Sequence, residues 1–421
     1  MTENKEQSKM VPKRRFKAFE NEDGWVKREL GEILDFSITT NSLSRNMLNY
    51  YGGELRSIHY GDILINYGSI LDVKTDVIPF VTGGKVKDFS SQLLKNGDIV
   101  FADAAEDETV GKAVEINGLR NADLVAGLHT IVGRPLSKFA ERYLGYYINS
   151  NSYHRQLIPL MQGTKVSSIS KNTLQKTKII YPNSINEQQD IGDFFTNLDQ
   201  TITLQQQKME KLKAMKSAYL SEMFPAEGER KPKRRFPGFI DDWEQRELGE
   251  SVKFINGRAY KQNELLDQGK YRVLRVGNFN TNDKWYYSDL ELNEDKYANE
   301  GDLLYLWATV FGPKIWENER IIYHYHIWKV QINDYEIDKQ YLYIWLENDK
   351  ELIQKNTNGS TMVHITKGFI EERIFQFPSD IEEQKQIGNF FKNLDQTITL
   401  QQQKLEKLQN IKKAYLNEMF I

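Results

Sequence analysis

The sequence contains no cysteine among its 421 residues. This absence excludes a fold held together by disulfides and any metal site built from thiolates. The formal net charge is only −3, because 56 Lys and Arg residues are offset by 59 Asp and Glu residues. The chain is therefore not basic as a whole, and binding to nucleic acid would depend on local clusters of cations or on a partner.

Long apolar runs are also missing. The first residues, MTENKEQSKMVPKRRF, lack the apolar segment of a signal peptide, and no later run is long enough to cross a bilayer. We therefore expect a soluble, cytoplasmic protein that does not associate with membranes. The hydrophobic fraction of 39%, which includes 22 Tyr and 21 Phe, is sufficient for two or three globular domains.

Motifs for catalysis are absent as well. The sequence has no GxxxxGK[ST] phosphate loop, no [DN]PP[FY] run of the kind that holds a flipped adenine in amino-methyltransferases, and no HExxH pair. We therefore expect no catalytic residues, no cofactor and no metal in this chain.

What the sequence does contain is a duplication. Residues 185–224 and 381–420 are identical at 29 of 40 positions, and both include the unbroken stretch NLDQTITLQQQK. Upstream, the basic lead PKRRF occurs at 12–16 and 232–236, and RELGE occurs at 28–32 and 246–250. The chain thus has a pseudo-twofold internal repeat, which suits a target that is itself roughly two-fold, such as duplex DNA.

The duplicated C-terminal segments are predicted to be two long helices. They lack proline, are rich in helix-favouring residues, and carry apolar residues at spacings of three and four over about four heptads. Because a globular region returns the chain between them, we expect the helices to pack as an antiparallel coiled coil. The predicted seam consists of Ile191, Phe195, Leu198, Ile202, Met209 and Leu212 in the first helix and Ile387, Phe391, Leu394, Ile398, Leu405 and Leu408 in the second. Lys216 and Lys412 are polar residues on this seam, where they would fix the register.

Each half also carries a mixed α/β region that differs between the copies, at about 33–183 and 251–378. Short correspondences survive, including Gly97-Asp98 with Gly301-Asp302, and His129 with His326 before a following strand. We interpret these matches as preserving the fold. The divergence around them is expected if the helices share a structural role while the inserts recognise different targets.

Several basic and amide residues of the inserts are candidates for contact with DNA, since Arg and Lys bind phosphates or guanine and Asn binds adenine. They are Lys85, Lys87, Arg134 and Arg155 in the first insert and Arg272, Arg275, Asn278, Asn280 and Lys284 in the second. The basic leads around Arg15 and Arg235 are either phosphate contacts or solvated segments.

The arrangement resembles the specificity subunit of type I restriction–modification systems. The resemblance covers about residues 25–420 and rests on RELGE after Trp25 and Trp243, G-[ST]-x-x-x-x-I at Gly163 and Gly359, and EQxxIGxFFxxLDxxI at Glu187 and Glu383. It implies an α+β architecture with two target recognition domains separated by the helix pair. The corresponding segments are a tail and basic lead (1–24), a first recognition domain (25–183), a first spacer helix (184–224), a linker (225–242), a second recognition domain (243–378) and a second spacer helix (379–421).

The resemblance further implies a non-catalytic subunit in which each recognition domain reads one half of a bipartite DNA site. The helices would set the spacing and dock two methyltransferase subunits, and motor-nuclease restriction subunits would complete the complex. S-adenosylmethionine, ATP and magnesium would bind to those partner subunits. Two alternatives stay open on the sequence alone, namely a single-chain DNA enzyme with an unrecognised catalytic centre and a coiled-coil protein adaptor.

Overall fold

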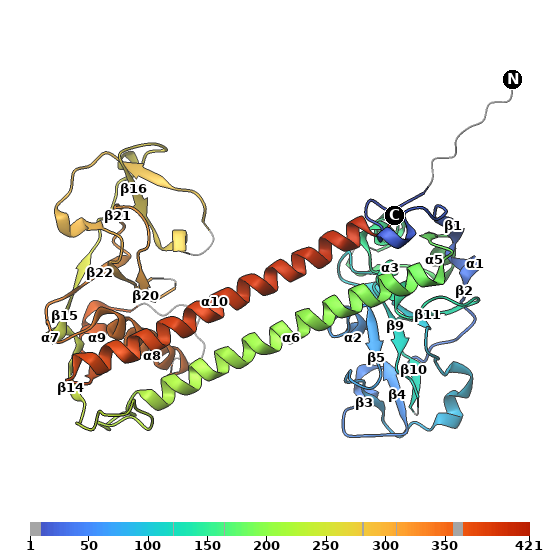
Figure 1. Ribbon diagram of the computed structural model, residues 1–421, viewed down its shortest axis with the longest axis horizontal. Coiled ribbons are helices and arrows are strands. Elements are labelled where there is room, and N and C mark those ends of the chain that lie inside the picture. Colours follow the sequence, from blue (N-terminus) through green and yellow to red (C-terminus); the bar gives the residue numbers. More distant parts are fainter. Residues whose placement is uncertain (1–9, 121, 164, 280–281, 309, 357–364) are drawn as a thin grey trace. The chain divides into compact units, whose positions relative to one another are not determined.

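The computed structural model describes residues 10–120, 122–163, 165–279, 282–308, 310–356 and 365–421. The chain divides into two compact units. Unit 1 comprises Met1–Gln206 and Lys404–Ile421, and unit 2 comprises Gln207–Gln403. Each unit contains one globular part together with portions of two long helices (Figure 1).

The two long helices are α6 (Ile185–Met223) and α10 (Ile381–Glu418), 39 and 38 residues long. At about 1.5 Å per residue, α6 is about 58 Å long. Each helix contains a single glycine in its second turn, Gly192 and Gly388. A Cβ atom there would lie 2.9 Å from the Glu141 carbonyl oxygen and 3.0 Å from the Tyr341 nitrogen, respectively. These glycines allow each globular part to approach the backbone of its helix closely.

The helices pair antiparallel in both units. In unit 1 the start of α6 meets the end of α10, with the Phe195 and Phe420 rings stacked 5.7 Å apart. In unit 2 the end of α6 meets the start of α10, with the Phe224 and Phe391 rings 6.2 Å apart. The residues of the predicted seam are buried or half-buried. Its buried members are Ile191, Phe195, Ile202, Ile387, Phe391 and Leu405, and its half-buried members are Leu198, Met209, Leu212, Leu394, Ile398 and Leu408.

Two corresponding ion pairs join the helices. Lys216 Nζ lies 2.6 Å from Asp395 Oδ1 in unit 2, and Lys412 Nζ lies 2.5 Å from Asp199 Oδ1 in unit 1. The two lysines occupy the same place in the duplicated sequence, as do the two aspartates. The polar seam positions therefore act as predicted, because each lysine pairs with a partner at a defined register.

The globular part of unit 1 is built on two sheets (Figure 1). The first has the order β2 (Leu34–Asp35), β11 (Thr130–Pro135), β7 (Ile99–Ala102), β9 (Ala113–Asn117) and β5 (Ile70–Asp72). The second has the order β10 (Asp123–Ala126), β4 (Leu55–Ile58), β6 (Phe80–Val81) and β3 (Leu48–Asn49). Two short pairs accompany them, β1 (Val26–Glu29) with β13 (Lys178–Tyr181) and β8 (Ala104–Ala105) with β12 (Ser167–Ser168). The short helices are α1 (Leu30–Ile33), α2 (Tyr60–Ile65), α3 (Tyr143–Ile148), α4 (Asn151–His154) and α5 (Lys171–Gln175).

Unit 2 is likewise built on two sheets. Its sheets have the orders β15 (Val252–Asn256), β22 (Ile327–Ile332), β19 (Leu303–Leu306) and β20 (Gly312–Ile315), and β17 (Tyr286–Ser288), β16 (Tyr271–Leu274), β21 (Ile321–Tyr323) and β18 (Tyr297–Ala298). The strand β14 (Glu244–Glu247) pairs with β23 (Ile374–Phe377). The helices are α7 (Leu248–Ser251), α8 (Lys339–Asn356) and α9 (Lys367–Glu371).

The two globular parts correspond at the Gly-Asp turns that the sequence predicted. Gly97 and Gly301 adopt left-handed conformations, with φ of 85° and 83°, immediately before β7 and β19. The following aspartates close both turns, because Asp98 accepts a hydrogen bond from the Lys95 nitrogen and Asp302 accepts one from the Asn299 nitrogen. The Gly-Asp pairs thus preserve the fold, as interpreted from the sequence.

Candidate nucleic-acid interface

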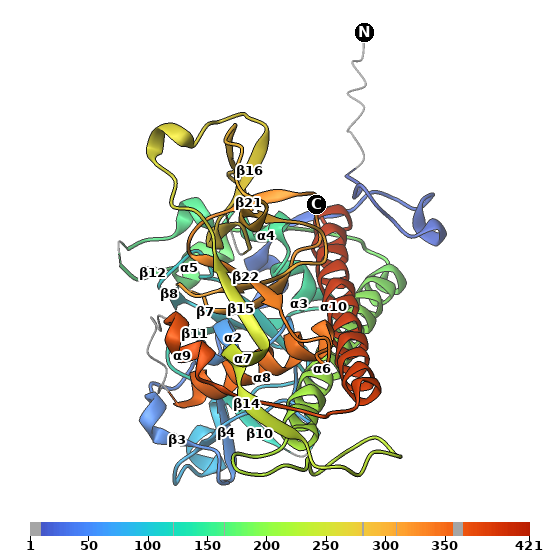
Figure 2. The ribbon, with the colours of Figure 1, turned by 90° about the vertical axis from the view of Figure 1, so that its left-hand side faces the viewer.

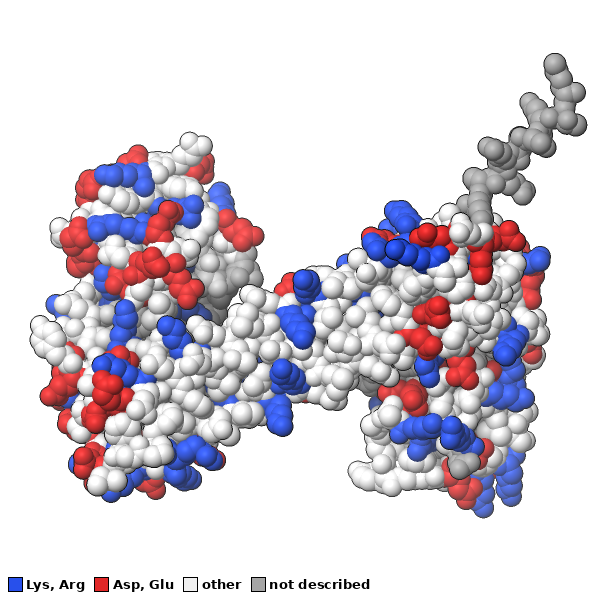
Figure 3. Space-filling model, viewed as in Figure 1, with Lys and Arg blue, Asp and Glu red and all other residues white. Residues whose placement is uncertain are grey.

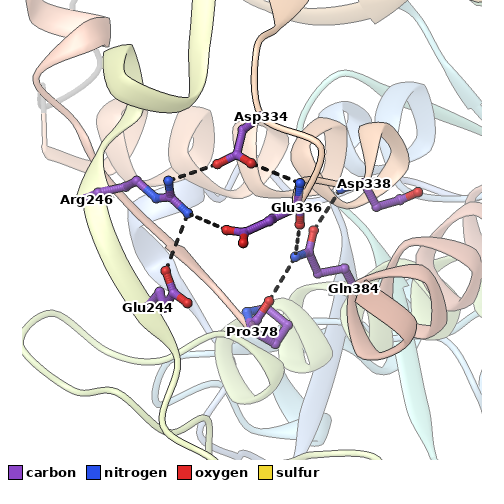
Figure 4. Close-up of polar contacts among 7 residues, drawn as sticks. All are labelled: Glu244, Arg246, Asp334, Glu336, Asp338, Pro378 and Gln384. Atoms are coloured by element: carbon purple, nitrogen blue, oxygen red, sulfur yellow. Dashed lines mark hydrogen bonds and ion pairs between the residues drawn. The ribbon is translucent and has the colours of Figure 1, made fainter. Parts of the chain in front are cut away.

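The duplicated Glu-Gln pair at the start of each long helix fixes that helix to its own globular part. In unit 1, Gln188 accepts a hydrogen bond from the Ala140 nitrogen and donates one to the Pro182 carbonyl. In unit 2, Gln384 accepts from the Asp338 nitrogen and donates to the carbonyls of Glu336 and Pro378 (Figure 4). The loop that contains Asp334, Glu336 and Asp338 is also tied to β14. Arg246 of β14 pairs with Asp334 at 2.8 Å and lies near Glu244 and Glu336 (Figure 4).

The glutamates of these pairs bind the basic leads. Arg15 donates two hydrogen bonds of 2.7 Å to Glu187, and Arg235 donates bonds of 2.6 and 2.7 Å to Glu383. Both glutamate side chains are fully buried. These arginines therefore serve the fold, and for Arg15 and Arg235 both sequence-based readings, a phosphate contact and a solvated segment, are wrong. A bidentate pair orients the guanidinium as well as neutralising it.

The predicted residues of the first insert fall into two groups. Lys85, Lys87 and Arg155 are exposed, and Lys85 and Lys87 follow a glycine turn in which Gly83 has a φ of 68°. Arg134 instead donates to both carboxylate oxygens of the buried Asp98, at 2.8 and 2.6 Å, and to the Leu93 carbonyl. Arg134 thus has an internal partner set, whereas the two lysines and Arg155 are accessible to a ligand.

The second insert shows the same division. Asn278 organises a turn, because its side chain accepts from the Arg275 nitrogen and donates to the carbonyls of Asn282 and Lys284. Arg275 and Lys284 both lie over the Tyr286 ring, each about 5.2 Å from its centroid. Arg272 is exposed, 3.4 Å from Glu319 and 5.5 Å from the centre of the Trp285 ring. Asn280 lies outside the described residues.

Cations on the surface around β16 are largely offset by nearby carboxylates. Lys270 pairs with Glu291, and Arg320 pairs with Glu294 at 2.7 Å. Figure 3 shows the result on one face, where blue and red side chains alternate over this part of unit 2. Exposed pairs of this kind contribute little to stability. They also leave this face without the continuous basic surface that would attract a DNA backbone by charge alone.

The pattern of duplicated segments has a counterpart among known proteins. A family model described as the type I restriction modification DNA specificity domain matches residues 22–214 and, a second time, residues 240–410. The chain belongs to this family. It is a specificity subunit of a type I restriction–modification system, the component that recognises DNA and that is not itself the catalytic subunit.

Individual relatives resemble either most of the chain or about half of it. The MjaX specificity subunit of Methanocaldococcus jannaschii is 22% identical over 405 residues, which cover 94% of this chain and 92% of that protein. The MjaVIII specificity subunit of the same organism is 25% identical over 182 residues, 43% of this chain and 42% of that protein. An S subunit from M. genitalium has a similar fold, with a TM-score of 0.59 and 15% identity over 98% of this chain and 99% of that one. A second solved chain, from a type I R-M system, has a TM-score of 0.56 and 17% identity over 94% and 97%.

Further negative findings concern the described part of the chain. No helix there combines the length and hydropathy needed to cross a membrane. Among the same residues, no three His, Cys, Asp or Glu side chains are grouped so that they could hold a metal ion.

Proposed function

We propose that the two globular parts of this specificity subunit read the two different halves of one bipartite DNA site. The single observation that carries this proposal is the contrast between the copies. The long helices are identical at 29 of 40 positions and pair through corresponding ion pairs, while the inserts share a parallel strand pair and the Gly-Asp turns but differ in most of their sequence. A duplicated scaffold with diverged inserts is suited to two half-sites of unlike sequence.

Within this proposal, α6 and α10 set the number of unread base pairs between the half-sites. They also provide the surface on which two methyltransferase subunits dock. Those subunits would bind S-adenosylmethionine and methylate adenine, and restriction subunits would use ATP and magnesium to move along DNA and cut it. The accessible residues Lys85, Lys87, Arg155, Arg272, Arg275 and Lys284 are proposed contacts to the DNA.

Mapping of N6-methyladenine across the host genome, with and without this gene, tests the proposal. We expect deletion to remove methylation from one motif made of two short blocks separated by unread base pairs, and complementation to restore it. A host that expresses this chain together with a catalytically inactive methyltransferase subunit serves as the control. Methylation that persists unchanged at every motif, in a host whose partner subunits are expressed and co-purify with this chain, would contradict the proposal.

A further inference from the structure

In each globular part, the second sheet contains a pair of parallel strands whose carboxyl ends meet at the same edge. The pairs are β4 with β10 in unit 1 and β16 with β21 in unit 2. The strands of each pair lie side by side in both Figure 1 and Figure 2. Loops that leave the carboxyl ends of parallel strands converge, and such edges are recurrent places for ligand binding in α/β sheets.

Backbone hydrogen bonds show that the two edges correspond residue by residue. The Gly127 nitrogen donates to the Ile58 carbonyl at 2.8 Å, and the His324 nitrogen donates to the Leu274 carbonyl at 2.9 Å. Gly127 therefore corresponds to His324, and Ile58 corresponds to Leu274. The residues that follow each of these positions along the chain correspond in the same way. These further pairs are His59 with Arg275, Leu128 with Tyr325, and His129 with His326.

The end of the neighbouring strand completes each edge. The Asp103 nitrogen donates to the His129 carbonyl at 3.1 Å, and the Trp307 nitrogen donates to the His326 carbonyl at 3.3 Å. Asp103 and Trp307 thus occupy the same place. We name the two groups by their members: cluster 1 is His59, Tyr60, Asp103 and His129 in unit 1, and cluster 2 is Arg275, Trp307, His324, Tyr325 and His326 in unit 2.

Cluster 1 is a compact polar and aromatic group at the surface. The Tyr60 ring lies 4.6 Å from the His59 ring and 5.2 Å from the His129 ring, and His129 Nδ1 lies 3.3 Å from Asp103 Oδ1. The His129 side chain is 50% exposed. Its backbone has a φ of 56°, a conformation that costs a residue other than glycine about 1 kcal/mol or more and that is often found at functional sites.

Cluster 2 presents aromatic rings at the same edge. Tyr325 lies 4.5 Å from the His324 ring, 3.9 Å from the His326 ring and 5.9 Å from the Trp307 ring, and it is 39% exposed. Two hydrogen bonds fix the backbone of the turn at Tyr325. The Tyr325 nitrogen donates to the Arg258 carbonyl, and Trp307 Nε1 donates to the Tyr325 carbonyl. The tyrosine side chain is therefore displayed on a well-supported backbone.

The chemistry of both clusters suits the edges of bases. Burial lowers the pKa of His59 below its ordinary value and lowers the pKa of His324 to about 4. Both imidazoles are therefore neutral near pH 7 and can carry one donor and one acceptor nitrogen. In His59 the acceptor Nδ1 is taken by the Gly61 nitrogen, which leaves the Nε2–H group as the donor. Arginine at position 275 could bind guanine through two hydrogen bonds, and an exposed ring could contact the thymine methyl group. Neutral histidines read hydrogen-bond patterns, whereas a site that only held phosphate would favour permanent cations.

We propose that clusters 1 and 2 are the base-reading surfaces of the two globular parts, and that their differing side chains determine the sequence of each half-site. This inference rests on the proposed function, and it adds which residues of each globular part contact the bases. One position keeps its histidine in both copies, while four surrounding positions differ on a common backbone: Gly127 becomes His324, His59 becomes Arg275, Leu128 becomes Tyr325 and Asp103 becomes Trp307. A purely structural role would favour similar side chains at equivalent backbone positions.

Exchange of residues between the clusters tests the inference in the assembled complex with its methyltransferase subunits. Tyr325→Leu and Arg275→His each introduce the residue that unit 1 carries at the same position. We expect genome-wide N6-methyladenine maps to show one altered or relaxed block and one intact block. Sites with a single mismatch in the altered block should gain about five-fold or more in methylation, the discrimination expected from one base contact. Tyr335→Leu is the matched control, because Tyr335 belongs to the same unit, is 103% exposed and lies outside cluster 2.

In unit 1 the reciprocal exchange is His59→Arg, and His129→Gln removes the imidazole at the position that both copies share; each should alter the other block only. Two unchanged blocks at normal methylation would overturn the inference, and so would an equal loss at all sites without a change in either block. If a variant of one unit fails to assemble, as judged by co-purification, the variants of the other unit decide the question by the same criteria. Failure of the proposed function is distinguishable, because the wild-type complex would then show no split motif at all.

Discussion

At the scale of single residues, the basic leads show how charge is used inside the fold. The Arg15 side chain is only 6% exposed and its partner Glu187 is fully buried. Replacing Glu187 by Gln leaves a buried guanidinium without its counter-charge, so we expect the free energy of unfolding to fall by about 3–5 kcal/mol. Glu383→Gln should have a similar effect through Arg235, since that pair has the same geometry. Urea unfolding of the full chain, followed by tryptophan fluorescence, measures the change.

Glu418→Gln provides the matched control for this prediction. Glu418 pairs with Arg14 at 2.7 Å, but the two side chains are 38% and 54% exposed. Exposed pairs contribute about 1 kcal/mol or less, so the unfolding midpoint should move little. Equal losses for Glu187→Gln and Glu418→Gln would show that burial does not govern the strength of the arginine pairs.

At the scale of elements, the register of α6 against α10 depends on the Lys216–Asp395 and Lys412–Asp199 pairs. These side chains are between one fifth and about one third exposed, so each pair should contribute about 1 kcal/mol. We expect Asp395→Lys to lower the thermal midpoint by placing two cations opposite each other. The double variant Lys216→Asp with Asp395→Lys should recover most of that loss. A double-mutant cycle measured by circular dichroism isolates the interaction, and a double variant no more stable than Asp395→Lys would count against a specific pair.

At the scale of the whole molecule, the proposed spacing role of the helices can be tested by length. Gln207 lies near the middle of the segment between Asp199 and Lys216 in α6. Gln403 occupies the corresponding place between Asp395 and Lys412 in α10. Matched insertions of seven residues after both glutamines preserve the heptad pattern. Seven residues add about 10 Å of helix, which equals about three base pairs. We therefore expect a longer unread gap, by up to about three base pairs, between two unchanged blocks in the methylation map.

Insertion after Gln207 alone is the control for this experiment. It lengthens one helix and not the other, so the Lys216–Asp395 and Lys412–Asp199 pairs can no longer both form, and methylation should be lost or strongly reduced. Matched insertions that change a block while the gap stays constant would refute the spacing role.

Much of this organisation was predictable because it is local and repeated. The helix pair follows from the apolar spacing of residues such as Ile191 and Phe195, since a stripe of this kind must be buried against a similar one. The Gly-Asp turns at Gly97 and Gly301 were recognisable because only glycine adopts such a φ at little cost. The candidate DNA contacts were chosen by residue type, and residue type does not reveal whether a cation already has a partner, as Arg134 has in Asp98.

The sequence by itself thus determined the duplication, the two long helices, the seam and the family, because these depend on periodicity and on motifs read along the chain. Only the tertiary structure decided that Arg15 and Arg235 close on buried glutamates, and that His59, Asp103 and His129 meet at one strand edge. Those groupings arise from strand pairing between segments distant in sequence. The pairing brings together residues whose separation along the chain carries no periodic signal.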